Sequence, residues 1–443
     1  MKRSFWGCAR ALSLACLVVL PACAEVRYLL ELAPGASATP LLARYGLAVI
    51  RSSANATETE LAVSAPAALS AALLKQLASE PGVRQVEAEQ VVRAPEAENS
   101  AAPTLQVLGP WFPLRLKLPF YGNQVQAGYL LQPAAAIIRT DEAHRRFGAG
   151  RSIVAIIDTG VDFAHPALRG SLLPGFDFTR DRVDTVDEYS DLPLSLAARL
   201  SQSTVEILDS NKVVRLNPST VAILNQSTVE ILDGGGLPSA FGHGTMVAGL
   251  VHLVAPRSMI LPLKAFQADG TASLYNVVRA IRYAVDHGAT VINMSFGFAQ
   301  SSPQLQAAID YATSKGVICL ASAGNAGKET PVFPASLPKV IGVGSTNFSD
   351  RRSPFSNYGR DARTSAPGEA LVTTFPGATY AGVWGTSFSS ALASGAAALV
   401  LEQRPGTTFG RLQDAFDSGV RINQDMGDGR LDLVRSLQYI LKN

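Results

Sequence analysis

Short apolar runs alternate with amphipathic stretches over the second half of this chain. The runs have the length and β-branched content of strands buried on both faces of a parallel sheet, and they lie at 152–158, 258–263, 290–295, 316–321 and 340–345. Helical periodicity is found at 244–254, 275–286, 304–315 and 389–401. Strands that alternate with helices in this way predict a doubly wound α/β fold, with a mostly parallel sheet and helices on both faces.

The first part of the chain has a different pattern. Strand-like segments at 26–32, 46–51, 60–63 and 83–92 are separated by helix-like segments at 38–45 and 67–79. The order β-α-β-β-α-β predicts a small α+β domain of the ferredoxin-like kind over residues 25–93. Residues 94–139 hold several prolines and an apolar cluster of Trp111, Phe112, Phe120 and Tyr121. We expect a linker with ordered patches, which either docks on the following domain or is removed with the preceding one.

Four tandem octads occupy residues 203–234, between two of the predicted strands. Each octad has a β-branched centre followed by Asp, Asn, Pro or Gly, which predicts short strands joined by tight turns in a meander or hairpin arm. Two interpretations stay open. The arm contacts a substrate or partner, or it is a duplication tolerated in a surface loop.

Composition narrows the class of protein. The chain has 443 residues, which is too long for one average domain, and 17% charged against 47% hydrophobic residues is typical of a globular protein. The net charge of +2 gives no reason to expect nucleic acid or an anionic surface as a partner.

The N-terminus has the pattern of an export signal over residues 1–24. Lys2 and Arg3 precede an apolar run at 11–20 and a small-residue cleavage site at 22–24, so we expect a periplasmic, secreted or extracellular protein. The alternative is a lipoprotein signal around Cys23, whose lipidation would attach the protein to a membrane. Removal of the signal leaves one cysteine, Cys319, in an apolar run, so we expect no internal disulfide and a buried thiol.

Three glycine-marked turns carry an Asp, a His and a Ser in that order. Asp158 ends a predicted strand, His243 stands between two glycines at the start of a predicted helix, and Ser387 precedes another helix. A serine needs a base to become a nucleophile, the base is usually a histidine, and an aspartate orients the imidazole. The helix start favours negative charge at Ser387, so its N–H is one expected oxyanion donor, and Asn325 is the other candidate, through its side-chain amide. Asp162 and His252 are the alternatives for the acid and the base.

The remaining histidines have structural interpretations. His165 lies in a loop with a following proline, where a structural hydrogen bond is expected. His144 and His287 lie near predicted helix ends, where solvated histidines are common.

The segments around these residues resemble a known family. Residues 155–162, 242–249 and 385–391 are similar to the three signatures of subtilisin-like serine peptidases (subtilases), and 321–327 resembles the oxyanion-hole loop of that family. The resemblance implies a subtilisin-like peptidase domain over residues 140–437 and an inhibitor-like propeptide over residues 25–93. It therefore implies a secreted endopeptidase made as a self-inhibited precursor, with protein or peptide substrates and its own propeptide as partners.

The resemblance also implies where a substrate binds. Residues 292–297 resemble the edge along which the family pairs an extended peptide, and the first pocket would be lined by Ser295, Phe296, Gly297, Ala323 and Gly324. Neither segment has a carboxylate, so we expect an apolar or aromatic residue before the cleaved bond. The chemistry requires no cofactor. A structural calcium ion stays possible, because subtilases bind calcium through loops without a simple motif. The rival hypothesis is a catalytically idle envelope binding protein on the same scaffold.

Overall fold

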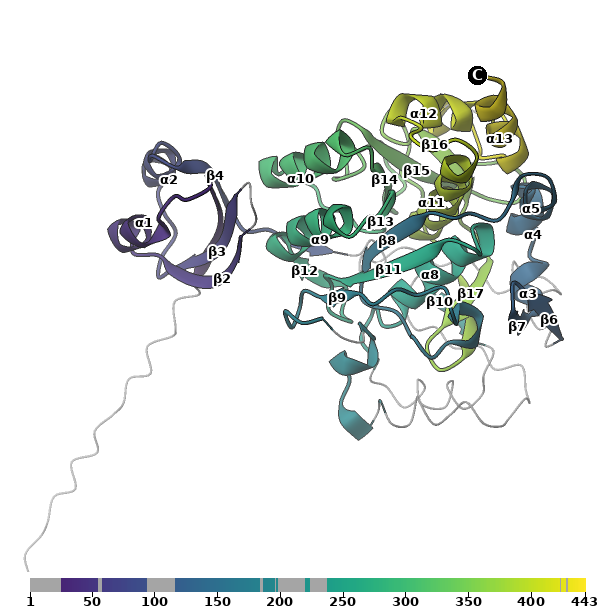
Figure 1. The fold of residues 1–443 in the computed structure, drawn as a ribbon, viewed down its shortest axis with the longest axis horizontal. Coiled ribbons are helices and arrows are strands. Elements are labelled where there is room, and N and C mark those ends of the chain that lie inside the picture. The colour runs from purple at the N-terminus through teal and green to yellow at the C-terminus, as the bar shows by residue number, and fades with distance from the viewer. Residues whose placement is uncertain are drawn as a thin grey trace, which may run out of the picture. The chain divides into compact units, whose positions relative to one another are not determined.

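The computed structural model describes two compact units, residues 1–88 and 89–443 (Figure 1). The expected export signal, residues 94–115 and most of the octads lie outside the described residues. The described residues are 25–54, 58–93, 116–183, 186–195, 197, 220–223, 237–422, 424–427 and 429–443.

The smaller unit is a four-stranded antiparallel sheet with two helices, in the strand order β2-β3-β1-β4. The predicted β-α-β-β-α-β order is confirmed. Tyr28, Leu30, Val63 and Leu77 are buried in its core. Its elements are β1 (Val26–Leu32), α1 (Ala38–Tyr45), β2 (Ala48–Ala54), β3 (Thr59–Ala65), α2 (Ala71–Ala78) and β4 (Val83–Ala88).

The strand predicted over 83–92 is wrong in one respect. It breaks after Ala88, and the chain begins a second strand, β5 (Val91–Arg93), which pairs within the larger unit. The apolar pattern alone does not distinguish one strand from two, because both segments alternate in the same way.

The larger unit has a seven-stranded sheet in the order β16-β15-β14-β13-β8-β11-β9, in which every neighbouring pair is parallel. The expected doubly wound α/β fold is confirmed. All residues of β13, β14 and β15 are buried, as the continuous apolar runs predict. The strands are β8 (Ile153–Asp158), β9 (Phe176–Asp177), β11 (Met259–Lys264), β13 (Val291–Met294), β14 (Ile318–Ser322), β15 (Val340–Thr346) and β16 (Thr364–Pro367).

Smaller sheets and helices surround this sheet. The small sheets are β6-β7, β12-β5 and β10-β18-β17. Their remaining strands are β6 (Lys117–Phe120), β7 (Asn123–Gln126), β10 (Thr220–Ile223), β12 (Thr271–Ser273), β17 (Leu371–Phe375) and β18 (Thr379–Val383). The α-helices are α3 (Ala127–Leu130), α4 (Pro133–Ile137), α5 (Thr140–Phe147), α8 (His243–Val254), α9 (Leu274–Asp286), α10 (Pro303–Ser314), α11 (Thr386–Gln403), α12 (Phe409–Asp417) and α13 (Leu433–Lys442). Short 3₁₀ turns lie at η3 (Pro166–Leu168), η4 (Tyr189–Asp191) and η5 (Gln424–Met426).

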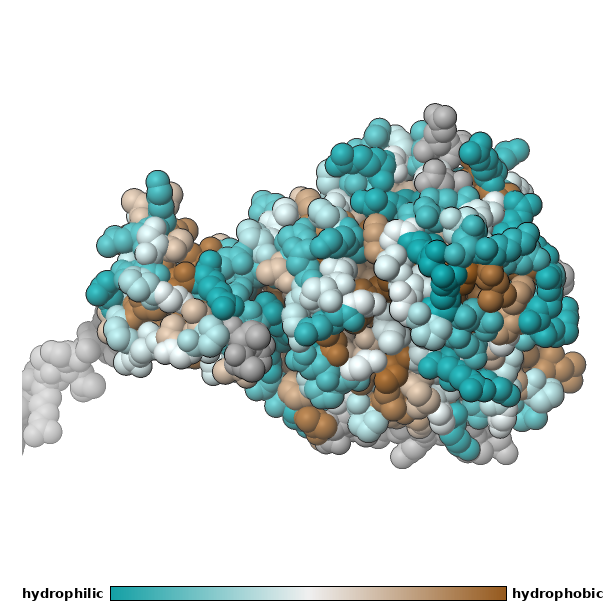
Figure 2. Space-filling model, turned by 45° about the horizontal axis from the view of Figure 1, so that its top comes forward, coloured by the Kyte–Doolittle hydropathy of each residue, from teal (hydrophilic) through white to brown (hydrophobic). Residues whose placement is uncertain are grey.

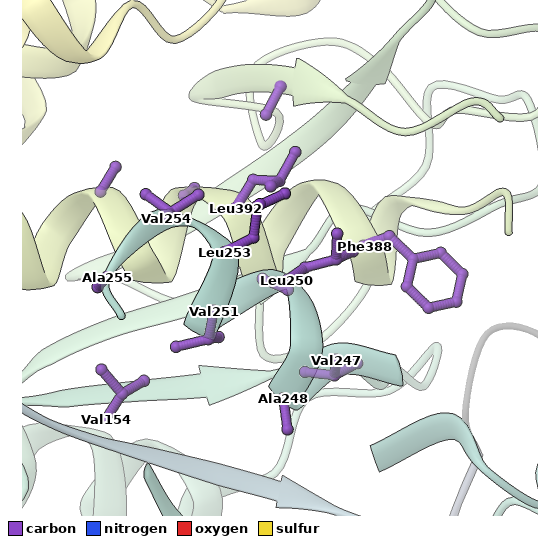
Figure 3. Packing of buried hydrophobic residues seen from close by; sticks show 14 of the residues in the cluster. Val154, Val247, Ala248, Leu250, Val251, Leu253, Val254, Ala255, Phe388 and Leu392 are labelled. Carbon is purple, nitrogen blue, oxygen red and sulfur yellow. The ribbon is translucent and has the colours of Figure 1, made fainter. Parts of the chain in front are cut away.

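Two helices, α8 and α11, form the centre of the hydrophobic core beside the sheet. Val251 and Val254 of α8 lie among the apolar side chains that include Leu392 of α11 (Figure 3). A methyl group at Gly395 would lie 2.7 Å from the Cβ of Val254, so the two helices approach too closely for any side chain there. Because α8 is buried along its whole length and α11 from Thr386 to Leu401, their N-termini are held rigidly.

Residues 116–139 form the ordered part of the expected linker. The β6-β7 hairpin leads into α3 and α4, and Val125, Tyr129 and Ile138 join the main core. The Tyr129 hydroxyl donates to the carbonyl oxygen of Gly249 in α8 at 2.6 Å. This portion therefore packs on the larger unit, whereas Trp111 and Phe112 lie outside the described residues.

One part of the octad segment is described. Residues 220–223 form β10, which pairs antiparallel with β18. A strand is the element expected there, whereas the complete arm stays a prediction because the other octads lie outside the described residues.

Hydrophilic residues cover most of the face of the larger unit seen in Figure 2, and hydrophobic side chains lie between them in separate groups. Scattered exposed apolar residues such as Leu131 and Leu194 are ordinary for a globular surface. In the part of the chain that the structure describes, no helix has the length and apolar character needed to cross a membrane.

Candidate active site

Asp158 and His243 meet at the carboxyl edge of the large sheet. Asp158 is the last residue of β8, and His243 is the first residue of α8. The Nδ1 atom of His243 lies 2.7 Å from Oδ1 of Asp158, and both side chains are buried. The same carboxylate oxygen accepts the backbone N–H of Thr159 at 2.8 Å. A carboxylate in this position holds the proton on Nδ1 and directs Nε2 to the other side of the ring.

Gly244 allows this approach of helix and strand. A Cβ atom at position 244 would lie 2.0 Å from the carbonyl oxygen of Gly160 and 3.2 Å from Cβ of Asp158. Any larger residue would therefore push the start of α8 away from the end of β8. The turn at His243 therefore needs a glycine at position 244 for steric reasons.

Ser387 lies in the first turn of α11. The sequence predicted a helix that begins at Ser389. The helix instead begins at Thr386, because the buried turn at Gly385 leads directly into it. The Ser387 hydroxyl donates to the carbonyl oxygen of Ser295 at 3.4 Å. The ring of the next residue, Phe388, has its centroid 5.6 Å from that of the His243 imidazole, so the serine turn and the histidine are neighbours.

Asn325 is attached to the same turn. Its Oδ1 atom accepts the backbone N–H of Thr386 at 2.9 Å and the Thr386 hydroxyl at 2.8 Å. Because Thr386 holds the oxygen of this amide, the nitrogen is the end of the side chain that can donate to an oxyanion at Ser387. The backbone N–H of Ser387 lies in the first helical turn, where N–H groups have no intrahelical acceptor.

A buried polar network beneath Ser387 was missed by the sequence analysis. The Oδ1 atom of Asn293 accepts hydroxyl groups of Ser390 and Ser394, each at 2.9 Å, and its Nδ2 donates to Ser295 Oγ at 2.8 Å. Ser295 Oγ in turn donates to the carbonyl oxygen of Ser387 at 3.0 Å. The network fixes α11 to β13. Two serines four positions apart on an otherwise apolar helix were the available signal.

Comparisons with known proteins agree with this geometry. The family model described as "Peptidase_S8: Subtilase family" matches residues 150–416.

The chain belongs to the subtilase family.

Individual relatives are 30–35% identical to this chain over the segments that align. The thermophilic serine proteinase of Bacillus sp. (strain AK1) is 33% identical over 266 residues, which are 58% of this chain and 53% of the relative. Thermitase of Thermoactinomyces vulgaris is 30% identical over 306 residues, which are 66% of this chain and 90% of thermitase. Subtilisin BL of Lederbergia lenta is 35% identical over 173 residues, 37% of this chain and 64% of the relative. The match thus spans about half of the Bacillus AK1 proteinase and most of thermitase.

A small cavity of about 150 Å³ lies beside the serine turn of this subtilase. Gly297 and Gly324 line it, together with Arg93, Asn325 and Val332, and none of the described residues in its wall is a carboxylate. Ser295, Phe296 and Ala323, which the sequence also assigned to the first pocket, are buried next to it without lining it. The ring of Phe296 instead lies against that of Phe266, with the two ring centroids 5.0 Å apart and the rings tilted by 39°.

The strand β5 lies next to this cavity, and its residue Arg93 lines it. Arg93 pairs antiparallel with Thr271, and Val92 with Ala272 of β12. On its other side the carbonyl oxygen of Arg93 accepts the N–H of Gly297 at 3.1 Å. An extended segment of the chain therefore lies between two edges of the larger unit, with Val92 completely buried.

Asp162, the alternative acid, has a structural role. Asp162 Oδ1 accepts the N–H of Ala164 at 2.9 Å, and its Oδ2 accepts the N–H of Gly377 at 3.0 Å. It therefore joins two loops. His243 bonds to Asp158 and not to Asp162.

Three of the other histidines bond to the backbone. His165 Nε2 lies 2.9 Å from the carbonyl oxygen of Thr379, and His144 Nε2 lies 2.7 Å from that of Val254. His287 is exposed and stacks on Tyr283 with the ring centroids 3.6 Å apart. His144 is half-buried, whereas the sequence suggested a solvated side chain.

His252, the alternative base, lies inside α8 with both ring nitrogens buried and without a hydrogen-bond partner among the described residues. Burial, and to a smaller degree the nearby His165 and His144, lowers its pKa to about 4. Its ring is nearly perpendicular to that of Phe120, with the two ring centroids 5.6 Å apart. A histidine in this environment stays neutral at pH 7.

His252 is expected to weaken the fold in acid. Its folded pKa of about 4 lies below the ordinary value of 6.5. Its stability contribution is therefore fully present above pH 6.5 and is lost as the pH falls towards 4, by about 3 kcal/mol in all. We expect His252→Leu to lose less stability than the parent between pH 7 and pH 4. Urea unfolding at several pH values, in a Ser387→Ala background that prevents self-digestion, measures this difference. Equal losses in both proteins would contradict the prediction, and His287→Leu is the exposed control.

The described part of the larger unit also holds one free cysteine, Cys319. Cys319 is buried in β14, and burial raises the pKa of its thiol to about 12. Within the described residues, no group of three or more His, Cys, Asp or Glu side chains could hold a metal ion.

Proposed function

We propose that this subtilase is an exported serine endopeptidase, made as a self-inhibited precursor, which cleaves peptide bonds with Asp158, His243 and Ser387. The observation that carries the proposal is the 2.7 Å contact between His243 and Asp158 at the start of α8, beside the helix turn that bears Ser387. The matching family and the relatives named as serine proteinases and subtilisins support the same chemistry.

The proposed reaction has two stages. Ser387 Oγ attacks the carbonyl carbon of the scissile bond while Nε2 of His243 takes its proton, and Asp158 stays ionised and stabilises the imidazolium. The N–H of Ser387 and the amide of Asn325 bind the oxyanion of the tetrahedral intermediate. His243 then protonates the leaving amine as the C–N bond breaks, and water hydrolyses the acyl-enzyme by the reverse sequence.

The position of β5 supports self-inhibition. Residues 91–93 pair with β12 and Gly297 in the way that an added peptide strand pairs with a sheet edge. If a substrate binds along the same edge, the precursor's own chain blocks it, and cleavage beyond Arg93 would release the block. The export pattern of residues 1–24 supports a location of the mature protein outside the cytoplasm, with attachment through a lipidated Cys23 as the alternative.

Fluorophosphonate labelling tests the proposal against the idle binding protein. Only a serine activated by a base reacts with such a probe. We expect one label per mature chain, on the peptide that contains Ser387. A mature chain that stays unlabelled, or a label on another serine, would refute the assignment.

Val332 is expected to control the residue accepted before the cleaved bond. Its methyl groups lie between Gly297 and Gly324, at 2.3 Å and 3.1 Å from where a Cβ atom of each glycine would be. No carboxylate is among the described residues that line this cavity, so we expect an apolar or aromatic side chain to be preferred there over a basic one. Val332→Asp would place a carboxylate in the cavity, and we expect the ratio of kcat/KM for Lys over Leu substrates to rise more than tenfold. Val332→Thr, which keeps the shape without a charge, should leave the ratio within threefold or so. An unchanged ratio in Val332→Asp would contradict this location of the pocket.

A further inference from the structure

A third carboxylate, that of Glu188, lies buried beside Asp158 and His243 but takes no part in the proposed reaction. Its Oε1 atom accepts the Thr159 hydroxyl at 2.6 Å and the backbone N–H of Gly244 at 3.1 Å. Its Oε2 atom accepts the Thr245 hydroxyl at 2.6 Å. The side chain is completely inaccessible to solvent, and all its donors come from the segments that hold the catalytic pair.

These donors connect Glu188 to both members of the pair. Thr159 directly follows Asp158 at the end of β8, and Gly244 directly follows His243 at the start of α8. The residue before the helix, Gly242, provides no side-chain cap. Glu188 therefore supplies from a distant loop the negative charge and the acceptor that the first turn of a helix favours.

The Thr159 hydroxyl couples the charge of Glu188 to the basicity of the Asp158 carboxylate. This hydroxyl has one proton and two acceptors within reach, Glu188 Oε1 at 2.6 Å and Asp158 Oδ1 at 3.3 Å. While Glu188 is ionised, the shorter bond takes the proton. If Glu188 loses its charge, the hydroxyl can turn to Asp158, and an added donor makes that carboxylate a weaker partner for a charged imidazole.

Some of the surroundings of Glu188 raise the pKa of its carboxyl group, and others lower it. Burial raises its pKa to about 7, against the opposing effects of the threonine hydroxyls and of Lys264. Lys264 is buried as well, and its ammonium group donates to Asp191 at 2.6 Å. Lys264 is thus paired with another carboxylate and only partly balances Glu188.

Arg180 brings a second positive charge to the edge of the cluster, but it is paired with Asp191, to which it donates at 2.7 Å. Asp158 contributes a like charge, and Tyr189 donates its hydroxyl to Asp162 Oδ2 at 3.2 Å. His243 faces Asp158 on one side and the ring of Phe388 on the other.

We propose that Glu188 is a positioning residue for catalysis, which holds the start of the His243 helix and, through Thr159, keeps Asp158 a strong partner for the protonated imidazole. The proposal rests on the proposed peptidase function. Its consequence is that the charge of Glu188, and not only its shape, sets the pH range in which His243 acts as a base.

The test compares Glu188→Gln with the wild type in the full chain after maturation, on a peptide substrate without titratable groups. Glutamine keeps the size and most hydrogen bonds but removes the charge. We expect kcat to fall about tenfold with KM nearly unchanged. We also expect the acidic limb of the kcat/KM profile to move to lower pH by at most about half a unit, because Glu188, with its pKa of about 7, is only partly ionised in that range. Active sites are counted with a fluorophosphonate, so incomplete maturation does not register as lost turnover.

Asp432→Asn is the matched control. Asp432 is also a buried carboxylate that caps a helix, because its Oδ1 accepts the N–H of Arg435 at 3.0 Å, but α13 carries no catalytic residue. This variant should lower the melting temperature without moving the pH profile. If Glu188→Gln behaves in the same way, with the profile and kcat of the wild type, Glu188 is structural only and the proposal is overturned.

A second variant decides the matter if Glu188→Gln does not fold. Thr159→Val keeps the branched shape but removes one donor from Glu188, which favours its neutral form, so the acidic limb should move in the same direction by a smaller amount. An unmoved limb would overturn the proposal. A wild-type protein that no fluorophosphonate labels would instead refute the peptidase function, so the two failures are distinguishable.

Discussion

Ser387→Ala is expected to reduce turnover about a million-fold while the fold is retained. Without the serine nucleophile, only substrate binding and the oxyanion donors still contribute to catalysis. The Ser387 hydroxyl donates one long bond of 3.4 Å to the Ser295 carbonyl, so its removal costs the fold little. Steady-state hydrolysis of a peptide substrate, together with the melting temperature, measures both effects.

Ser389→Ala is the matched control for this prediction. Ser389 lies on the same helix two residues further on, is equally buried, and donates to the carbonyl oxygen of Ala366 at 3.0 Å. We expect this variant to lose some stability and to retain turnover within about tenfold. Comparable losses of turnover in the two variants would show that Ser387 is not the nucleophile.

Asp158→Asn is expected to lower kcat about ten-thousand-fold near neutral pH. An asparagine that offers its NH₂ group to His243 Nδ1 would favour the tautomer with the proton on Nε2, which cannot accept the serine proton. It would also leave the imidazolium without its partner at 2.7 Å. The dependence of kcat/KM on pH, measured for both proteins, tests this because activity should return partly in alkali.

Asp162→Asn separates the two candidate acids. Asp162 joins the turn at Ala164 to Gly377, so the variant should be less stable but retain kcat within about tenfold. If Asp162→Asn were the more damaging of the two for kcat, the assignment of Asp158 as the orienting acid would be wrong.

The large sheet was predictable because local pattern and tertiary environment agree there. A strand covered on both faces needs apolar residues at every position, and the runs that end at Asp158 and precede Asn325 have this character. Parallel strands end at one edge of a sheet, so residues that follow them are brought together whatever their separation in the chain. The approach of Asp158 and His243 follows from these two facts and from the glycine at 244.

The parts that sequence did not predict depend on contacts between distant segments. Glu188 lies 55 residues before His243 in the numbering, in a loop without regular periodicity, and only the folded chain buries it under the start of α8. The break after Ala88 was invisible for a related reason. Pairing with β12 and Gly297 turns residues 91–93 into a separate strand, and nothing in their own alternation specifies that partner.

The central claim, a serine peptidase that matures itself, is tested most directly by the intact mass of the purified precursor beside that of Ser387→Ala. Because β5 is paired with β12 and Gly297 up to Arg93, we expect the wild type to lose its N-terminal region by a cut between residues 93 and 140. The Ser387→Ala chain should keep this region under the same conditions. A wild-type chain that stays uncut, or a Ser387→Ala chain cut at the same position, would contradict the account.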